Sequence, residues 1–275
     1  MTKTAILLAT YNSEKYIIPL LDSIQNQTYT DWSLTIHDDG SSDRTLEITE
    51  EYMSKDGRIS IALEGMKLGA AKSFMELLKI TNADYYLFCD HDDVWLPNKV
   101  EKTVELLDKI STSNPQLPVI VHSDLYVVNE DLQIINNSFW KSSRIDPKVL
   151  KFVNISQVFN SVTGCAMAFN NNAKTVSFPY ADNLPMHDWW INLCVLKNKG
   201  IVEEIVEPLI YYRQHGNNEV GARQVDNSYF YQKLLNIKKT IGDQLTHIKF
   251  LRSIGGINFF QYYYYKLYYT IIRNL

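Results

Sequence analysis

The sequence predicts an α/β fold in which a mostly parallel central sheet is flanked by helices. Short apolar runs alternate with amphipathic segments in the first half of the chain, which is typical of strands joined by crossover helices. The 275 residues are 45% hydrophobic and 21% charged, as in globular proteins. This length suffices for one large domain with a small appendage. We therefore expect a main domain over residues 1–225 and a helical C-terminal extension over residues 226–275.

The elements follow in order along the chain. Strands are expected over Thr4–Ala9, Ser33–His37, Ile59–Leu63, Tyr85–Cys89, Val119–Ser123, Val162–Phe169, Ile201–Val206 and Leu209–Arg213. Helices are expected over Glu14–Gln27, Arg44–Met53, Ala71–Ile80, Asn98–Ile110 and Asp188–Lys197, and residues 226–275 are predicted to be helical with a break at Gly255-Gly256. Right-handed crossovers bring the carboxyl ends of parallel strands to one edge of the sheet, where ligands bind in such folds.

Charge and cysteine content narrow the class of protein. A net charge of −4 gives no general case for nucleic-acid binding. The three cysteines, Cys89, Cys165 and Cys194, lie in apolar stretches without a CxxC spacing, which predicts buried free thiols in a reducing compartment. The apolar run over residues 5–9 is too short for a signal peptide, and no apolar stretch is long enough to span a membrane. We expect a cytoplasmic protein.

Polar residues follow three of the predicted strands. The runs are Thr10-Tyr11-Asn12, Asp38-Asp39-Gly40-Ser41 and Asp90-His91-Asp92-Asp93. Three carboxylates within four residues repel one another unless a cation neutralises them. Oxygen ligands suit Mg²⁺ or Mn²⁺, and Mg²⁺ is commonly held by one or two carboxylates together with substrate phosphates. The alternative is a solvated acidic turn that caps the next helix.

The turn after the second strand is a candidate nucleotide site. A carboxylate of Asp38 or Asp39 can accept hydrogen bonds from a base or ribose, and Tyr11 at the neighbouring strand end can stack on the base. The alternative is an Asx turn that caps a helix. Similarly, Asp188 is either a catalytic base or a helix cap, and the three tryptophans Trp95, Trp189 and Trp190 are either sugar-stacking surfaces or core residues.

Six motifs in order resemble those of family 2 glycosyltransferases. They are Ala9-Thr10-Tyr11-Asn12, the run Asp38-Asp39-Gly40-Ser41-Ser42-Asp43, the run from Asp90 to Pro97, the run from Thr163 to Phe169, His187-Asp188-Trp189-Trp190, and the run from Tyr212 to Asn218. The resemblance covers roughly residues 3–223 and is strongest to bacterial rhamnosyltransferases of cell-surface polysaccharide assembly. His91 stands where this subgroup often has glutamine, and it receives no role.

The resemblance implies a GT-A fold and an inverting, metal-dependent transfer of a sugar from a nucleoside-diphosphate donor to a saccharide acceptor. It implies that Asp188 is the catalytic base and that Asp92 and Asp93 serve the ribose, the diphosphate and a bound Mg²⁺ or Mn²⁺. His215 is expected as a third metal ligand, with the alternative that it donates to the diphosphate. The residues expected to contact the donor are Thr10, Tyr11, Asn12, Glu14, Asp39, Lys72, Asp90, Asp92 and Arg213. The expected donor is dTDP-L-rhamnose, with UDP-galactose, UDP-glucose and N-acetylhexosamine donors as alternatives.

Two other functions compete with this hypothesis. A nucleotidyltransferase usually has a glycine-rich basic loop near its N-terminus, and residues 9–14 contain neither glycine nor arginine. A non-catalytic nucleotide-sugar-binding protein does not require the acids at 39, 92, 93 and 188.

The C-terminal extension predicts a surface partner. From residue 227 onward the chain has seven basic residues and one acid beside a tyrosine-rich run, whereas the preceding part has 20 basic and 30 acidic residues. Tyrosine favours the membrane interface, and basic residues favour anionic lipids. We expect peripheral contact with the inner face of the membrane, where a lipid-linked acceptor would lie. The alternative is packing on the catalytic domain or on a second copy in a homodimer.

Overall fold

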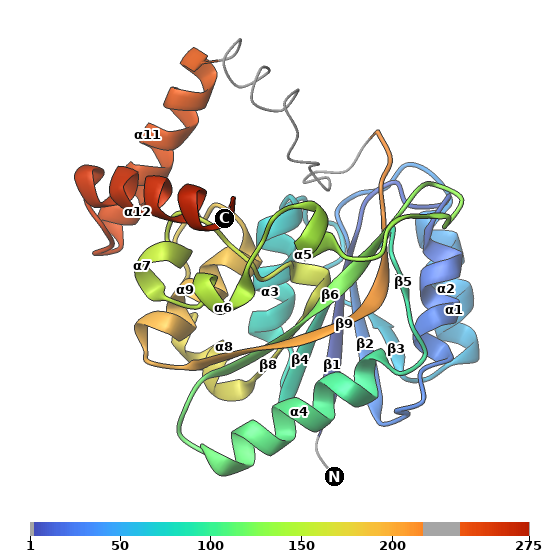
Figure 1. Ribbon diagram of the computed structural model, residues 1–275. Coiled ribbons are helices and arrows are strands. Elements are labelled where there is room, and N and C mark those ends of the chain that lie inside the picture. Colours follow the sequence, from blue (N-terminus) through green and yellow to red (C-terminus); the bar gives the residue numbers. More distant parts are fainter. Residues whose placement is uncertain (1–2, 217–236, 275) are drawn as a thin grey trace.

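The computed structural model describes residues 3–216 and 237–274, which form a nine-stranded sheet with helices on both faces (Figure 1). The strands are β1 (Thr4–Thr10), β2 (Trp32–Asp38), β3 (Ile59–Ile61), β4 (Tyr85–Asp90), β5 (Val94–Trp95), β6 (Val119–Val128), β7 (Ile134–Asn136), β8 (Met167–Asn170) and β9 (Ile201–Arg213). The helices are α1 (Ile17–Gln25), α2 (Thr45–Lys55), α3 (Ala70–Ile80), α4 (Lys99–Ser113), α5 (Phe139–Ser142), α6 (Pro147–Leu150), α7 (Val153–Ser156), α8 (Asn171–Val176), α9 (His187–Lys197), α11 (Ile237–Ser253) and α12 (Phe259–Ile272), with a 3₁₀ turn η1 (Gly164–Ala166).

The strand order is β3-β2-β1-β4-β8-β6-β9-β5, with β7 paired to β6. Strands β1 to β4 pair in parallel, β8 runs antiparallel to both β4 and β6, and β9 runs parallel to β6. Strands β1, β2, β4, β6 and β9 therefore end at the same edge of the sheet. This confirms the predicted α/β class and brings the polar runs after β1, β2 and β4 together.

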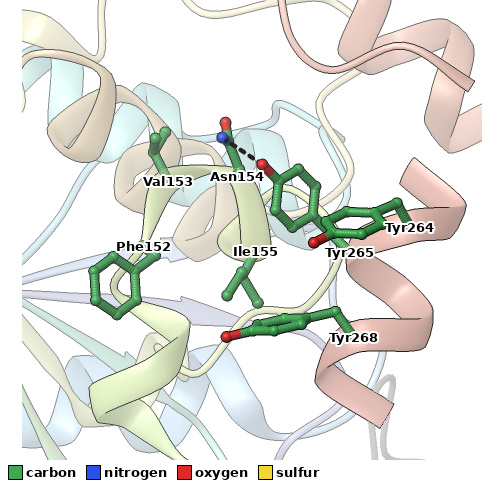
Figure 2. A pocket seen from close by; sticks show the side chains of 7 residues that line it. All are labelled: Phe152, Val153, Asn154, Ile155, Tyr264, Tyr265 and Tyr268. Atoms are coloured by element: carbon green, nitrogen blue, oxygen red, sulfur yellow. Dashed lines mark hydrogen bonds between the residues drawn. The ribbon is translucent and has the colours of Figure 1, made fainter. Parts of the chain in front are cut away.

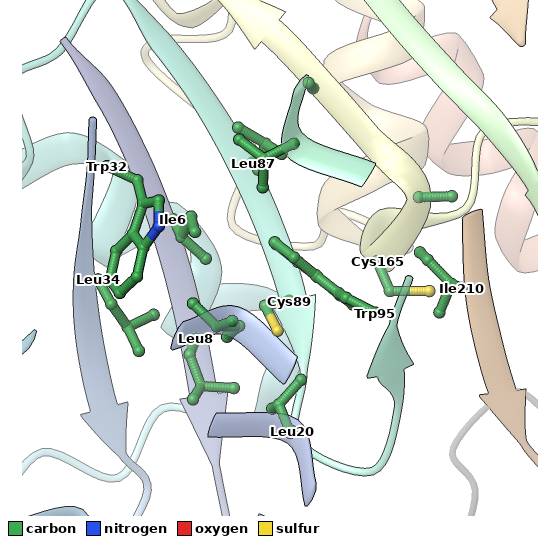
Figure 3. Packing of buried hydrophobic residues seen from close by; sticks show 14 of the residues in the cluster. Ile6, Leu8, Leu20, Trp32, Leu34, Leu87, Cys89, Trp95, Cys165 and Ile210 are labelled. Atoms are coloured by element: carbon green, nitrogen blue, oxygen red, sulfur yellow. The ribbon is translucent and has the colours of Figure 1, made fainter. Parts of the chain in front are cut away.

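Two apolar layers hold the sheet between its helices. On β1, Ile6 and Leu8 face the layer that contains α1, α2 and α4, whereas Ala5 and Leu7 face the layer that contains α3 and α9. Successive side chains of a strand point to opposite faces, so this alternation is typical of a strand that is buried on both faces. Figure 3 shows part of the first layer, where Trp95, Cys89 and Cys165 lie close to Ile210.

The second half differs from the prediction in two places. The segment expected as a strand over Val162–Phe169 begins as the turn η1 and becomes β8 only at Met167. The two strands expected between Ile201 and Arg213 are one strand, β9, whose register against β6 shifts on both sides of Asp124. A β-bulge disrupts the pairing of two strands only locally, so β9 continues through the positions at which the apolar pattern of the sequence is interrupted.

The C-terminal helices lie together beside α7 and α9 (orange and red in Figure 1). Helix α12 begins at a capping box in which Asn258 and Gln261 bond each other's backbone N–H groups. The hydroxyl of its Tyr269 accepts the backbone N–H of Asp146 at 2.8 Å, and this tyrosine is fully buried. The expected boundary at residues 225 and 226 lies outside the described residues. Among the described helices, none is both long and apolar enough to cross a bilayer.

Candidate functional site

The loops after β1 and β2 are joined by hydrogen bonds from side chains that are predicted to bind the donor. The hydroxyl of Thr10 is buried and donates to Asp38 Oδ1 at 2.9 Å. Asn12 has a positive φ of 47°, and its Oδ1 accepts the N–H of Ser42 at 2.9 Å. Glu14 accepts the N–H of Arg44 at 3.0 Å. In this structure these hydrogen bonds hold the two loops together, and donor contact by the same side chains stays a prediction.

Tyr11 and Asp39 directly follow β1 and β2, at the same edge of the sheet. The Tyr11 side chain is exposed, 55% of its surface being accessible, so its ring is open to a base. The Asp39 carboxylate accepts the backbone N–H groups of Leu68 at 2.5 Å and Gly69 at 3.1 Å, just before α3. Backbone N–H groups at such a helix start favour a carboxylate. Asp39 is thus held in place from one side, and its buried neighbour His37 lies 3.5 Å away.

Two exposed lysines lie near Asp39. Lys72 is exposed on the first turn of α3. Lys67 lies across Gly40, since a Cβ built on that glycine would meet Lys67 Cε at 2.5 Å. Gly40 also has a φ of +91°, which L side chains rarely adopt. Lys67 had no signal in the sequence beyond its charge, because its position depends on how the loop before α3 folds over the turn after β2.

The acidic run after β4 contains a carboxylate with unsatisfied bonding capacity. Asp93 is fully buried, and its Oδ2 has no hydrogen-bond partner among the described residues. One ligand atom each of Asp90, Asp93 and Cys165 lie within 4.8 Å of one another. Burial, followed by the charges of Asp92 and Asp90, raises the pKa of Asp93 well above its usual range.

This arrangement fits a hard divalent cation. A cation would satisfy the orphaned oxygen of Asp93 and offset the repulsion between the carboxylates. The thiol of Cys165 is an unsuitable ligand for Mg²⁺, because burial raises its pKa and keeps it protonated. Asp90 and Asp93 are therefore the oxygen donors that the geometry favours.

The predicted metal ligands Asp92 and His215 lie against each other beside this group. His215 Nε2 is 2.8 Å from Asp92 Oδ2. The ring of Tyr16 stacks on His215 with centroids 4.8 Å apart, and the guanidinium of Arg213 lies 4.9 Å from the centroid of the same ring. Tyr16 was missed by the sequence analysis, because only the fold brings the start of α1 beside the end of β9.

Arg213 lies behind the acidic run, and its expected contact with a phosphate stays a prediction. It is only 4% exposed. Its Nε donates to the carbonyl of Asp92 at 2.7 Å, its backbone N–H donates to Asp93 Oδ1 at 3.2 Å, and its Nη1 donates to the carbonyl of Glu130. Arg213 therefore braces the backbone of the acidic run and of the loop after β6.

Asp188 lies at the start of α9, as the sequence predicts. Its Oδ2 accepts the N–H of Gly164 at 3.0 Å, and its Oδ1 accepts the N–H of Trp189 at 2.5 Å. Burial raises the pKa of Asp188 to about 6, although these two hydrogen bonds act in the opposite direction. A carboxylate with this pKa is ionised at neutral pH yet basic enough to accept a proton.

The neighbouring His187 is a packing residue. It is 3% exposed, and its ring lies 4.1 Å from that of Phe74 and 4.8 Å from that of Phe88 between centroids. Burial lowers its pKa to about 3, so the ring is neutral at physiological pH. A Cβ at Gly164 would meet His187 Nε2 at 2.7 Å. Glycine at position 164 thus permits the close approach of η1 to α9.

The turn η1 connects the two groups of acids. Gly164 donates to Asp188, and the next residue, Cys165, lies with Asp90 and Asp93. The carboxylate of Asp188 and the acidic run are thus separated by two consecutive residues of one buried turn.

Among the three tryptophans, Trp95 and Trp190 are core residues, 2% and 8% exposed, and the ring of Trp189 stacks on that of His247 in α11 with centroids 4.4 Å apart. Of the two interpretations of the tryptophans, core packing rather than sugar stacking therefore applies to Trp95 and Trp190.

A further buried charge lies below the acidic run. Lys99, at the start of α4, is 0% exposed, and its Nζ is 3.6 Å from the centroid of the Trp95 ring, with no hydrogen-bond partner among the described residues. Burial lowers its pKa to about 8, while the charges of Cys89, Cys165 and Asp93 oppose this shift. Its burial has no signal in the sequence, because a lysine near a helix start is usually solvated.

Known proteins are similar to this chain in sequence. The profile of the family described as Glycosyl transferase family 2 matches residues 5–173. The chain is 29% identical over 230 residues to the dTDP-rhamnosyl transferase RfbG of Shigella flexneri, with 78% of this chain and 74% of that protein covered. It is 28% identical over 266 residues to the UDP-Glc:alpha-D-GlcNAc-diphosphoundecaprenol beta-1,3-glucosyltransferase WfaP of Escherichia coli, with 94% and 95% covered.

A solved structure shares the fold. The crystal structure of TarS of Staphylococcus aureus in complex with UDP-GlcNAc superposes with a TM-score of 0.60 at 19% identity, covering 84% of this chain. The matched region spans 64% of the length of that TarS chain. At this identity the likeness concerns the fold alone, which is the GT-A arrangement of a mixed sheet with flanking helices.

Proposed function

This chain belongs to glycosyltransferase family 2, and from that premise we propose that it is an inverting glycosyltransferase of cell-surface polysaccharide biosynthesis. It transfers one sugar from a nucleoside-diphosphate donor to a saccharide acceptor. The observation that supports this most directly is the turn η1, where Gly164 bonds the basic Asp188 while Cys165 lies with Asp90 and Asp93. A proton acceptor and a group suited to a metal and a diphosphate thus lie against two adjacent residues of one turn.

In the proposed reaction Asp188 takes the proton of the acceptor hydroxyl as that oxygen attacks the anomeric carbon. The bond from the anomeric carbon to the diphosphate breaks, and the configuration inverts, as in other inverting reactions that use a general base opposite the leaving group. The raised pKa of Asp188, about 6, suits this role. Its hydrogen bonds from Gly164 and Trp189 hold the carboxylate in one orientation.

The remaining residues bind and orient the donor. Tyr11, exposed just after β1, stacks on the base, and Asp39 accepts hydrogen bonds from the base or ribose. Lys67 and Lys72 approach the diphosphate. Asp90 and Asp93 would hold Mg²⁺ or Mn²⁺, and the Asp92–His215 pair would lie beside the ion. When bound, such an ion stabilises negative charge on the departing diphosphate.

We propose dTDP-L-rhamnose as the donor, supported by the similarity to the rhamnosyl transferase RfbG. UDP-glucose is the second candidate, because the match to the glucosyltransferase WfaP extends over nearly the whole of both chains. The name of WfaP also supports a lipid-linked saccharide as the acceptor. An acceptor of this kind places the reaction at the cytoplasmic face of a membrane.

A donor panel tests the proposal. The protein is heated with Mn²⁺ or Mg²⁺ and each of dTDP-L-rhamnose, UDP-glucose, UDP-galactose and UDP-N-acetylglucosamine, because a bound donor raises the melting temperature. Candidates are then incubated with polyprenyl-diphosphate saccharides, and released nucleoside diphosphate and glycosylated product are measured. Transfer of glucose but never of rhamnose would replace the first donor by the second.

The same experiment separates the competing classes. A binding protein would be stabilised by a donor without releasing nucleoside diphosphate when any acceptor is added. A nucleotidyltransferase would release pyrophosphate from a nucleoside triphosphate and a sugar phosphate. Either result would contradict the proposed transfer reaction.

A further inference from the structure

Helix α12 is apolar on two opposite sides. Its inward residues Tyr262 and Tyr269 are 5% and 0% exposed. Its outward side carries a second apolar stripe at the helical spacing 260, 264, 267, 268 and 271, formed by Phe260, Tyr264, Leu267, Tyr268 and Ile271, which are 82%, 63%, 63%, 43% and 54% exposed. A helix on the surface of a globular protein normally presents polar residues outward. The outward stripe is therefore a surface that is built for contact.

The stripe continues into a cavity between α12 and α7. The cavity has a volume of about 440 Å³ and is lined by Phe152, Val153, Asn154, Ile155, Tyr264, Tyr265 and Tyr268. In Figure 2, Phe152 and Ile155 lie across it from Tyr265 and Tyr268, and Asn154 Nδ2 donates to the hydroxyl of Tyr265 at 3.0 Å. Phe152 is itself 63% exposed. The stripe and the cavity together expose an aromatic and aliphatic surface with hydroxyl groups at its edge.

The segments that form this surface are basic. Residues 139–160 and 244–275 together contain eight lysines and arginines and one acid, Asp146, whereas the rest of the chain contains 19 basic and 30 acidic residues. The two segments are joined directly, since Arg273 Nη2 donates to the carbonyl of Ser143 at 3.0 Å. The net charge of the two segments that contribute to this surface is thus opposite to that of the rest of the chain.

We propose that the outward stripe of α12 and the adjoining cavity are a docking surface for an anionic phospholipid bilayer. Apolar side chains enter the boundary between headgroups and acyl chains, tyrosine hydroxyls stay at the wet side, and the basic residues attract anionic headgroups. The cavity accommodates part of an acyl chain. A second copy of the protein fits less well, because a two-fold interface would set the same basic segments against themselves.

The surface is connected to the proposed catalytic base through a few contacts. The Tyr265 hydroxyl bonds Asn154 of α7, and the last residue of α7, Ser156, accepts through its carbonyl the indole N–H of Trp189 at 2.6 Å. Trp189 follows Asp188 directly. If the proposed function holds, a bilayer on this surface would bring a lipid-linked acceptor close to the start of α9.

Vesicle co-sedimentation of the full chain tests the inference without donor or acceptor, so its outcome is independent of the sugar transferred. Vesicles of phosphatidylcholine with 30% phosphatidylglycerol, roughly the anionic range in which basic residues near a membrane act, are compared with phosphatidylcholine alone. We expect binding to the anionic vesicles at low salt and much weaker binding at high salt, because salt screens exposed charges. Absence of binding, or equal binding to both vesicles, overturns the proposal.

A matched pair of variants localises the contact. The double substitution Phe260→Ser and Leu267→Ser removes two exposed residues from the stripe, and we expect on the order of a tenfold or greater loss of binding. The control, Ile134→Ser with Ile135→Ser, removes two side chains that are each 49% exposed on β7, and we expect wild-type binding. Equal binding by both variants overturns the proposal. So does a wild-type dimer, seen by analytical ultracentrifugation, that the Phe260→Ser, Leu267→Ser variant converts to a monomer.

Discussion

The backbone N–H of Gly164 donates to Asp188 Oδ2 at 3.0 Å, and the empty side-chain position of Gly164 is filled by His187, whose Nε2 would lie 2.7 Å from an added Cβ. One glycine therefore fixes both the proposed base and the histidine that precedes it. Because His187 is wedged between Phe74 and Phe88, it has little room to move away.

We expect Gly164→Ala to lower the free energy of unfolding by about 1–3 kcal/mol, the usual cost of overpacking a core. We also expect a lower kcat with little change in donor affinity, since the displaced group is Asp188 and not a residue that is proposed to bind the nucleotide. Urea unfolding and steady-state kinetics measure the two effects. Gly57→Ala is the control, because a Cβ there meets nothing within 4 Å, and a stability change as large as that of Gly164→Ala would contradict the steric explanation.

The proposed base makes a prediction about pH. The pKa of Asp188 is raised to about 6, so kcat should rise as pH increases through 6 and level off above it, because only the carboxylate accepts a proton. Asp188→Asn should lose at least about 10²-fold in rate, on the scale of general-base removal, while donor binding stays nearly unchanged. Near-normal turnover by this variant would refute the assignment.

The raised pKa of Asp188 also makes the free energy of unfolding depend on pH. Asp188 binds its proton more tightly in the folded than in the unfolded chain, so its contribution to stability is present at low pH and is lost as pH rises through 6. The stability of the wild type relative to Asp188→Asn should therefore fall by about 2 kcal/mol between pH 4 and pH 7. Chemical denaturation of both proteins at the two pH values measures this difference, and a constant difference would indicate an ordinary pKa.

The acidic run leads to a prediction about metal binding. Asp93 is fully buried with an orphaned Oδ2, so Asp93→Asn keeps the shape of the side chain but removes the charge that attracts a cation. We expect the affinity for Mn²⁺ together with nucleoside diphosphate to fall by at least about tenfold, as for loss of one charged interaction of roughly 1.4 kcal/mol or more. Isothermal titration calorimetry measures it.

Asp131→Asn is the control for that experiment, because Asp131 is exposed in the loop after β6. Its affinity for Mn²⁺ and nucleotide should equal that of the wild type. If Mn²⁺ neither tightens donor binding nor speeds transfer in the wild type, the metal site itself is refuted.

The sequence predicted the sheet edge well, because strand and helix periods are local and parallel strands must end together. Asp39, Asp93 and Asp188 follow or begin elements whose bounds were nearly right. The orientation of side chains was less predictable. Whether Arg213 faces a phosphate or braces Asp92 depends on contacts between residues more than a hundred positions apart. Tertiary contacts of this kind leave no periodic trace in the sequence.

Lys99 illustrates the same limit and leads to the last prediction. A lysine at a helix start is ordinarily solvated, yet Lys99 is fully buried over Trp95 because η1 and β8, encoded some way downstream, close the core above it. Its pKa is lowered to about 8 from the ordinary lysine value of 10.5, chiefly by burial. The folded chain therefore binds this proton less tightly than the unfolded chain does, and the cost of burying the ammonium is present below pH 8 and is relieved as pH rises towards 10.5.

We expect the stability of the wild type relative to Lys99→Met to increase by about 2–3 kcal/mol between pH 7 and pH 10, from the size of this shift. Methionine retains the apolar stem in the core while it removes the charge. Denaturant unfolding of both proteins at the two pH values gives the difference directly. Lys109→Met, an exposed position on the same helix α4, should change stability by no more than about 0.5 kcal/mol. A pH-independent difference between the wild type and Lys99→Met would mean that the Lys99 amine is solvated as an ordinary surface lysine is, and that it exerts no field on Asp93.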